Sequence, residues 1–233
     1  MHRRHLIATL PVAALARPRP AAAAAAAAGP VVVELFTSES CSSCPPADAA
    51  LAELVEARAD VLALSWHVTY WNRLGWHDPF SLPEATERQR RYAASLGHGQ
   101  VYTPQVVVQG RRDLVGSDRA ALRAAIRAAQ AERPASIDLG LVAETGMVRV
   151  RIGEGAAGAT PWLIGYDPRQ ATAVGGGENR GRQLVHANVV RAVVSLGLWQ
   201  GTPASVQVPR PAGERLALLL QSPAGIVLAA ARG

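Results

Sequence analysis

The sequence has no lysine, and only two of its 233 residues are cysteines. The 24 strongly basic side chains are therefore all arginines, against 18 acidic side chains. They form no basic block or groove pattern, so we expect no nucleic acid partner. The apolar segment near the N-terminus, Leu6–Ala16, has eleven residues, whereas a helix that spans a bilayer needs about 20. We therefore expect no stable membrane anchor.

The first 28 residues are typical of an export signal. Arg3 and Arg4 precede the apolar segment, and an alanine-rich stretch with many small-residue cleavage sites follows it. The arginine pair fits a twin-arginine signal as well as an ordinary Sec signal, and an uncleaved, disordered tail is the alternative. Without residues 1–28, 20 arginines remain against 18 acidic residues, so the net charge falls from +6 to +2. Export to the periplasm or out of the cell would place both cysteines where a disulfide is stable.

Both cysteines lie in one short motif, Val31–Asp48, with the sequence VVVELFTSESCSSCPPAD. Its first six residues are mostly apolar and β-branched, which predicts a buried strand. A polar turn with Cys41 and Cys44 follows, and Pro45–Arg58 then has the pattern of a helix with prolines in its first turn. A strand, a C-x-x-C turn and a helix in this order predict the front of a thioredoxin-like unit.

This layout favours redox chemistry at Cys41 and Cys44. The partial positive charge and the unpaired N–H groups of a helix N-terminus lower the pKa of a nearby thiol. We predict that Cys41 attacks a disulfide, because the outer cysteine of such a turn is usually the more exposed, and that Cys44 resolves the mixed disulfide. The helix begins either at Cys41 or near Cys44 with Ser43 as its cap. A structural disulfide is the main alternative, although so short a loop constrains the unfolded chain little.

The second predicted strand, Asp60–Trp66, leads into a loop rich in histidine and aromatic residues, His67–Phe80. A right-handed crossover would place it parallel to the first strand, so that both strands end at the same edge of the sheet. We therefore expect His67 and Trp71 near Cys41, with His67 as a base or as a partner of a thiolate. The aromatic side chains would line a groove for a peptide or a small thiol, or would simply cover the edge of the sheet.

The next elements complete the predicted core. Pro83–Leu96 has a helical pattern, and we expect its arginines, Arg88 among them, to face solvent. In Val101–Gln109, Thr103 and Pro104 stand directly before a β-branched run, and a proline cannot lie in the middle of a strand. A cis bond here would expose the backbone of Thr103 to an extended substrate. With a further strand and a final helix, the order β-α-β-α-β-β-α predicts a thioredoxin-like domain over residues 30–133.

Several segments together resemble one protein family. They are ELFTSESCSSCPPAD, HVTYWNRLGWHDPF, VYTPQVVVQG, GSDR and GENRGR. From about Val31 onwards the sequence is similar to an exported family of the thioredoxin superfamily, domain of unknown function family 1223. The resemblance implies a thioredoxin-like fold but no established reaction. The site residues that match the family pattern are Cys41, Cys44, Tyr102, Thr103 and Pro104. The sequence departs from the family at Thr69, where an acidic residue is common, which leaves His67 as the proton acceptor expected in this loop.

Residues 134–233 predict a β-rich subdomain that packs on this core. Strand candidates such as Met147–Ile152 and Arg215–Gln221 alternate with turns, and Asn188–Leu196 also fits a helix. The glycine-rich loop Gly175–Arg182 is no phosphate loop, because it lacks the G-K-[ST] end. We expect it to be an exposed hairpin loop, and the alternative is a segment that covers the cysteine site or binds a partner.

The sequence thus favours an α/β protein that acts as an exported thiol–disulfide oxidoreductase. Cys41, Cys44 and His67 would carry the reaction, and its substrate would be a protein or a small molecule with a thiol or disulfide. The substrate-binding residues would be Trp71, Tyr102, Thr103 and Pro104. No cofactor is needed, and without further cysteines the electrons must be exchanged with a separate redox partner. One alternative is a Cu(I) or Zn(II) site of Cys41, Cys44 and His67, and another is a non-enzymatic module that binds a partner.

Overall fold

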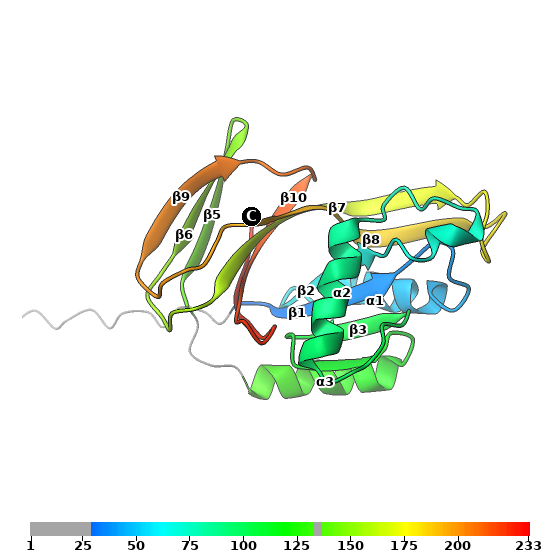
Figure 1. Cartoon of the computed structure of the whole chain (residues 1–233), viewed down its shortest axis with the longest axis horizontal. Coiled ribbons are helices and arrows are strands. Elements are labelled where there is room, and N and C mark those ends of the chain that lie inside the picture. Colours follow the sequence, from blue (N-terminus) through cyan, green and yellow to red (C-terminus); the bar gives the residue numbers. More distant parts are fainter. Residues whose placement is uncertain (1–28, 133–136) are drawn as a thin grey trace, which may run out of the picture.

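The computed structural model describes residues 29–132 and 137–233. The predicted signal peptide, residues 1–28, lies outside the described residues, as does the start of the predicted C-terminal subdomain. The described chain is a mixed α/β protein with one large sheet, a second small sheet and three α-helices (Figure 1). No helix in these two ranges combines the length and the apolar character needed to cross a membrane.

The first half of the described chain has the predicted element order β-α-β-α-β-β-α. Its elements are β1 (Val31–Thr37), α1 (Pro45–Ala57), β2 (Val61–His67), the 3-10 helix η1 (Asn72–Leu74), α2 (Pro83–Ser95), β3 (Gln105–Val108), β4 (Arg112–Val115) and α3 (Arg119–Ala131). β1 pairs parallel with β2 and antiparallel with β3, which pairs antiparallel with β4. The carboxyl ends of β1 and β2 therefore meet at one edge, where Thr37 lies opposite His67.

Every regular element described after Glu132 is a strand. The strands are β5 (Leu139–Glu144), β6 (Met147–Ile152), β7 (Thr160–Ala173), β8 (Gln183–Ser195), β9 (Ala204–Pro209), β10 (Arg215–Gln221) and β11 (Val227–Arg232). The segment that also fits a helix, Asn188–Leu196, belongs almost entirely to strand β8.

The C-terminal strands divide between two sheets. Four of them extend the first sheet, whose strand order is β11-β10-β7-β8-β2-β1-β3-β4, and the others form the small sheet β5-β6-β9. β8 joins β2 in parallel through the pair Ser65 and Val189. The sequence predicted a β-rich subdomain packed on the core, whereas the structure shows that four of these strands continue the core's own sheet. The long β7–β8 hairpin thereby reaches the carboxyl edge of β1 and β2.

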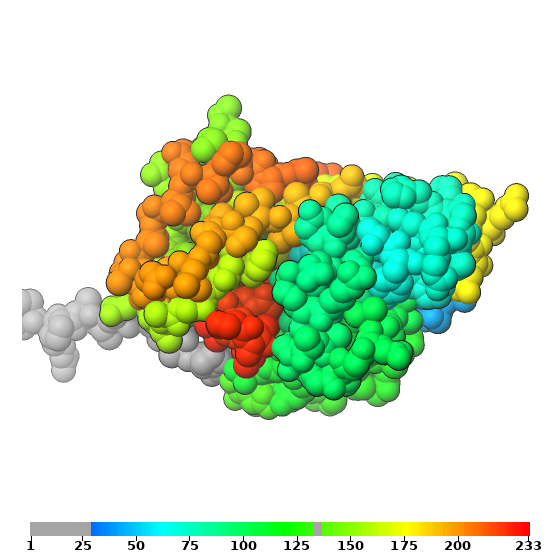
Figure 2. All heavy atoms as spheres, in the orientation of Figure 1, coloured from blue at the N-terminus to red at the C-terminus, as the bar shows by residue number. Residues whose placement is uncertain are grey.

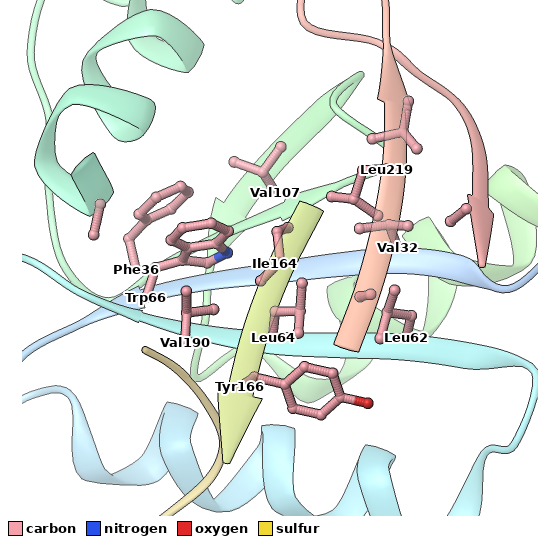
Figure 3. Packing of buried hydrophobic residues seen from close by; sticks show 14 of the residues in the cluster. Val32, Phe36, Leu62, Leu64, Trp66, Val107, Ile164, Tyr166, Val190 and Leu219 are labelled. Carbon is pink, nitrogen blue, oxygen red and sulfur yellow. The ribbon is translucent and has the colours of Figure 1, made fainter. Parts of the chain in front are cut away.

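The central strands are buried on both faces. On one face, α2 and the C-terminal strands pack around a cluster that includes Phe36, Leu64, Trp66, Ile164 and Leu219 (Figure 3). On the other face, α1 and α3 cover the alternate residues of β1. A third cluster fills the space between the small sheet and strands β7, β10 and β11. Burial on both faces explains why β1 has a nearly continuous apolar run and not an alternating one.

One network of polar side chains lies inside this core. Arg88 donates to Glu34 from Nε at 2.6 Å and from Nη2 at 3.0 Å, and it donates to Gln221 from Nη1 at 3.1 Å. The hydroxyl of Tyr92 also donates to Glu34. Arg88 is only 2% exposed, so the prediction that it faces solvent is wrong. On a helix, a buried arginine with a carboxylate partner has the same sequence signature as a solvated one, and the partner here comes from β1.

Replacing Arg88 with alanine leaves the Glu34 carboxylate buried without its charge partner. We expect the free energy of unfolding, measured by chemical denaturation, to fall by about 3–5 kcal/mol. Arg90→Ala is the matched control, because Arg90 lies on the same helix with its side chain 63% exposed. It should change the free energy of unfolding by less than about 0.5 kcal/mol. Equal effects of the two substitutions would contradict a structural role for the Arg88–Glu34 pair.

Candidate functional site

The cysteine turn lies between the end of β1 and the start of α1. Helix α1 begins at Pro45 with Cys44 as its N-cap. Pro45 and Pro46 occupy its first turn, where a missing backbone N–H breaks no helical hydrogen bond. Of the two predicted starts the helix adopts the later one, although the cap is Cys44 and not Ser43. Cys41 therefore lies in the loop before the helix, and its carbonyl accepts a hydrogen bond from the Cys44 N–H at 3.2 Å.

Cys41 and Cys44 form a disulfide in which the Cα atoms lie 5.4 Å apart. Both residues are fully buried, with 0% of their surface exposed. The prediction that Cys41 is the more exposed cysteine is therefore wrong. It assumed that Cys41 faces solvent at the edge of the sheet, whereas the exposed residues of this turn are Ser42 and Ser43.

Thr103 contacts Cys41 directly, and Trp71 contacts Thr103. The Thr103–Pro104 bond is cis and lies directly before β3, the neighbour of β1. The Thr103 hydroxyl donates to Cys41 Sγ at 3.3 Å, and the indole N–H of Trp71 donates to the same hydroxyl oxygen at 2.7 Å. The sulfur also lies 3.4 Å from Ser43 Oγ. The structure thus joins Cys41 to Thr103, the residue before the cis-proline, and joins Trp71 to Cys41 through Thr103.

Tyr102 and His67 make their contacts elsewhere. The hydroxyl of Tyr102 donates to Asp113 at 2.8 Å. His67 is buried, its Nδ1 shares a hydrogen bond of 2.8 Å with Asp78, and its ring centroid lies 4.6 Å from that of His186. In the part of the chain that the structure describes, no hydrogen bond joins His67 to either cysteine. The loop after β2 also supplies an acid, Asp78, which sequence analysis did not single out.

A cluster of buried ionisable side chains surrounds His67. Its members, none more than 5% exposed, are Glu39, Asp48, His67, Asp78 and His186. Nε2 of His186 lies 3.5 Å from Glu39 Oε1, and its Nδ1 lies 3.7 Å from Asp48 Oδ2. The sequence patterns predicted no role for Glu39 and Asp48. Their signal was present, because the two acids flank the C-x-x-C turn within the same motif.

Two pKa values in this cluster are shifted. Burial lowers the pKa of His186, but its contacts with Asp48 and Glu39 outweigh burial and raise the pKa to about 10. Burial raises the pKa of Asp78, but His67 and two backbone N–H groups outweigh burial and lower the pKa to about 2. At neutral pH, His186 is therefore a buried cation between two acidic side chains, and Asp78 is a buried anion.

The tip of the β7–β8 hairpin, Gly175–Arg182, contacts the cysteine turn. Asn179 Nδ2 donates to the carbonyl of Cys41 at 2.8 Å, and Glu178 Oε2 accepts from the N–H of Ser42 at 2.8 Å. Figure 2 shows this hairpin tip, in yellow, beside the cyan loop that follows β2. The segment is thus the exposed hairpin loop that the sequence predicts, because Glu178, Arg180 and Arg182 are exposed, and it also contacts the cysteine turn, as in the alternative.

Three consecutive glycines let the hairpin tip approach this closely. A Cβ on Gly175 would lie 2.7 Å from the ring of Trp76, and one on Gly177 would lie 2.6 Å from Ser40 Oγ. A Cβ on Gly176 would meet a backbone oxygen at 2.7 Å. Real Cβ atoms essentially never approach other atoms this closely. A side chain at any of the three positions would therefore push the tip away from its neighbours.

In residues 29–132 and 137–233, no group of three or more His, Cys, Asp or Glu side chains is placed to hold a metal ion. In the disulfide form of the protein, the two sulfurs of the alternative ligand set Cys41, Cys44 and His67 are bonded to each other.

Comparison with known families identifies the family of the chain. Residues 32–221 match the family model described as protein of unknown function (DUF1223). The chain belongs to the DUF1223 family. The matched region of this DUF1223 member extends from β1 to the end of β10, so it contains the cysteine turn, the cis bond and the hairpin tip. Among curated proteins, no sequence matches the chain.

Two solved structures are similar to this DUF1223 protein. A protein of Agrobacterium tumefaciens, known from an X-ray crystal structure, shares 31% sequence identity with a TM-score of 0.75 over 88% of this chain and 94% of that one. HBP35 of Porphyromonas gingivalis shares 14% identity with a TM-score of 0.60 over 88% of this chain and 75% of that one. At this lower identity the second similarity shows a common fold alone.

Gly177→Ala should loosen the hairpin tip, because the new Cβ would overlap with Ser40. We expect dithiothreitol to reduce the Cys41–Cys44 disulfide about tenfold faster than in the unsubstituted protein, which corresponds to about 1.4 kcal/mol. Gly181→Ala is the matched control. Both glycines have positive φ, 68° and 82°, but a Cβ on Gly181 would meet nothing within 4 Å. Equal reduction rates in the two variants would show that the contact with Ser40 does not protect the disulfide.

His186 should make the stability of the oxidised protein fall as the pH rises. Its folded-state pKa of about 10 lies above the value of about 6.5 for an unfolded histidine. Its stabilising contribution is therefore complete below about pH 6.5 and is lost as the pH approaches 10. Denaturation curves between these pH values should show a decline that His186→Gln lacks.

His98→Gln is the control for this measurement, because His98 is 46% exposed and bonds to Asp113 at the surface. The chain has no lysine, and its cysteines do not titrate as a disulfide, so few other groups change charge in this range. A decline of the same steepness in His186→Gln would show that another group causes it.

Proposed function

We propose that this protein is an exported thiol–disulfide oxidoreductase with a thioredoxin-like core, in which Cys41 attacks and Cys44 resolves. The observation that carries the proposal is the position of the disulfide. It directly precedes helix α1, and the residue before a cis-proline donates a hydrogen bond to its outer sulfur. The strand order β2-β1-β3-β4 with helices α1, α2 and α3 supports a thioredoxin-like core over residues 30–133.

In the reducing direction, the Cys41 thiolate attacks one sulfur of a substrate disulfide. A bond forms between Cys41 Sγ and that sulfur, and the other substrate sulfur leaves as a thiolate and takes up a proton. Cys44 then loses its proton and attacks Cys41 Sγ, which restores the Cys41–Cys44 disulfide and releases the first substrate sulfur to be protonated. Two electrons and two protons thus pass to the substrate. The reverse sequence oxidises a substrate dithiol, and the separate redox partner determines the direction.

Two features favour an ionised Cys41 after reduction. The N-terminus of the 13-residue helix α1 follows the turn, and its partial positive charge stabilises a nearby thiolate. The Thr103 hydroxyl already donates to Cys41 Sγ in the disulfide form. A hydrogen bond to the charged form of a group favours that form and lowers its pKa.

Substrate docking is supported by the backbone next to the cis bond. Among the described residues, the N–H and C=O of Thr103 take part in no hydrogen bond, so they are available to pair with an extended substrate. Trp71 and Pro104 flank this position. Tyr102 has a supporting role, because Asp113 holds its hydroxyl and Gln89 donates to its carbonyl at 2.7 Å. His67 acts on the site through Asp78 and His186 rather than by direct contact with a sulfur.

The burial of both sulfurs adds a requirement to the reaction. A substrate sulfur reaches Cys41 only after a local movement of the segments that pack around the two sulfurs. The hairpin tip is the segment we assign to this movement. The tip and the turn are far apart in the sequence. Glu178, one of the two tip side chains that bond to the turn, is exposed.

The proposal is tested by covalent trapping with insulin as the probe. Reduced Cys44→Ser protein should form a stable mixed disulfide with insulin through Cys41, detected by mass spectrometry. Cys41→Ser should trap none, and the unsubstituted protein should catalyse insulin reduction by dithiothreitol. The resolving thiol is missing only in Cys44→Ser, which is why that variant alone accumulates the intermediate.

Three other outcomes would replace this proposal. A reduction potential of the cysteine pair below about −300 mV, without trapping, indicates a structural bridge. Stoichiometric copper or zinc on the reduced protein, lost in Cys41→Ser, indicates a metal-binding protein. Binding of a partner that survives both cysteine substitutions indicates a non-enzymatic module.

A further inference from the structure

A chain of two hydrogen bonds ends on the outer sulfur of the cysteine turn. We propose that Trp71 is a positioning residue that acts through Thr103: its indole N–H occupies the acceptor side of the Thr103 hydroxyl and so directs the hydroxyl proton to Cys41 Sγ, where it stabilises the thiolate. This inference deepens the proposed function and rests on it. It assigns Trp71 a role that does not depend on contact with substrate.

The direction of the two hydrogen bonds follows from which group of each pair can donate. An indole N–H donates and never accepts, so the 2.7 Å bond runs from Trp71 Nε1 to Thr103 Oγ1. A hydroxyl has one proton, which must point away from the N–H that it accepts. The acceptor on that side is Cys41 Sγ at 3.3 Å. In the disulfide this sulfur is a weak acceptor, but after reduction a thiolate is a charged acceptor and the same bond becomes stronger.

The Trp71 side chain is held in place on several sides. It packs against the core cluster beneath α2 and lies under the guanidinium of Arg73, which is 5.7 Å from its ring centroid. Phenylalanine at this position keeps an aromatic ring for the core and for the cation–π contact. Trp71→Phe therefore removes the indole N–H while most of the packing remains.

Tyr70 is the other side chain that interacts with the Thr103 hydroxyl. Its own proton is directed to Gln89 Oε1 at 3.2 Å, and burial raises its pKa to about 12. Tyr70 therefore remains a neutral phenol where thiols titrate. A neutral phenol is a weaker acceptor than a thiolate, so it does not take the Thr103 proton once Cys41 is ionised.

Other groups also act on the Cys41 thiol, and they come from several elements. Ser43 Oγ lies 3.4 Å from the sulfur, and the Glu178 carboxylate of the hairpin tip bonds to the next backbone N–H. The buried ionisable side chains beside the turn are Glu39, Asp48, His67, Asp78 and His186. Substitutions at Trp71 and Thr103 leave all of these groups in the protein. Their effects are therefore common to the variants compared below.

The test measures the pKa of the Cys41 thiol in reduced Cys44→Ser protein. Ultraviolet absorbance of the thiolate is the readout, because it needs no reagent to reach the buried sulfur. We expect Thr103→Val to raise this pKa by about one unit and Trp71→Phe to raise it by about half a unit. Thr103→Ser keeps a hydroxyl and should restore the original value. The double variant Trp71→Phe/Thr103→Val should match Thr103→Val alone, because Trp71 acts only through the hydroxyl.

Trp76→Phe is the matched control. It also removes one indole N–H near the cysteine turn, but that N–H donates to Glu39 Oε2 at 2.7 Å and not to Thr103. Any effect of Trp76→Phe on the pKa of the Cys41 thiol should therefore be the same with and without the Thr103 hydroxyl. An effect of Trp71→Phe that persists in the Thr103→Val background would overturn the proposal.

Failure of this inference can be told apart from failure of the proposed function. If insulin is trapped but Trp71→Phe leaves the pKa of the Cys41 thiol unchanged, the oxidoreductase stands and Trp71 has no positioning role. If the pKa shifts are found but no disulfide exchange occurs, the hydrogen-bond chain stands and the proposed reaction is wrong.

Discussion

The burial of Cys41 and Cys44 constrains the rest of the structure, because the Cys41 carbonyl needs a partner inside the protein. A buried backbone group without a partner costs about 1–3 kcal/mol. The carbonyl of Cys41 finds its partner in Asn179 of the hairpin tip, and Glu178 of the tip adds a bond to the N–H of the exposed Ser42. The tip reaches the turn because β8 lies next to β2 in the same sheet. The C-terminal strands are therefore part of the candidate site and not an appendage of the first half.

The buried ionisable side chains beside the turn differ from the Arg88–Glu34 pair of the core in how they are paired. Glu39 Oε1, both carboxylate oxygens of Asp48 and both ring nitrogens of His186 have no hydrogen-bond partner in the described part of the chain. They are held by mutual attraction at 3.5 and 3.7 Å. Buried charges of this kind add little to stability compared with apolar packing. Their concentration next to a C-x-x-C pair is more typical of a functional site, in contrast to Arg88 and Glu34, whose bonds are direct and well paired.

The sequence predicted what local chemistry determines. The β-branched run of β1 and the prolines of α1 act within a few residues, and the corresponding elements are confirmed. It failed where the partner is remote. Asn179 bonds to a carbonyl 138 residues away, and Arg88 to a carboxylate 54 residues away. Neither contact leaves a periodic pattern, so the burial of Cys41 and of Arg88 could not be predicted. The family is shown by comparison, whereas the redox reaction remains a proposal.

The contacts that hold the hairpin tip against the turn are separate from the contacts made with the sulfur of Cys41. Asn179 and Glu178 bond to backbone atoms, while Thr103 and Ser43 provide the polar atoms next to Cys41 Sγ. Release of the hairpin tip would therefore change access to the disulfide without removing the donors that stabilise a thiolate. Loss of the Thr103 donor would change the thiolate without opening the turn. Under the proposed function, this separation would make a fully buried cysteine pair compatible with a reactive thiol. Accessibility would then depend on a segment from β7 and β8, and acidity on residues next to β2 and β3.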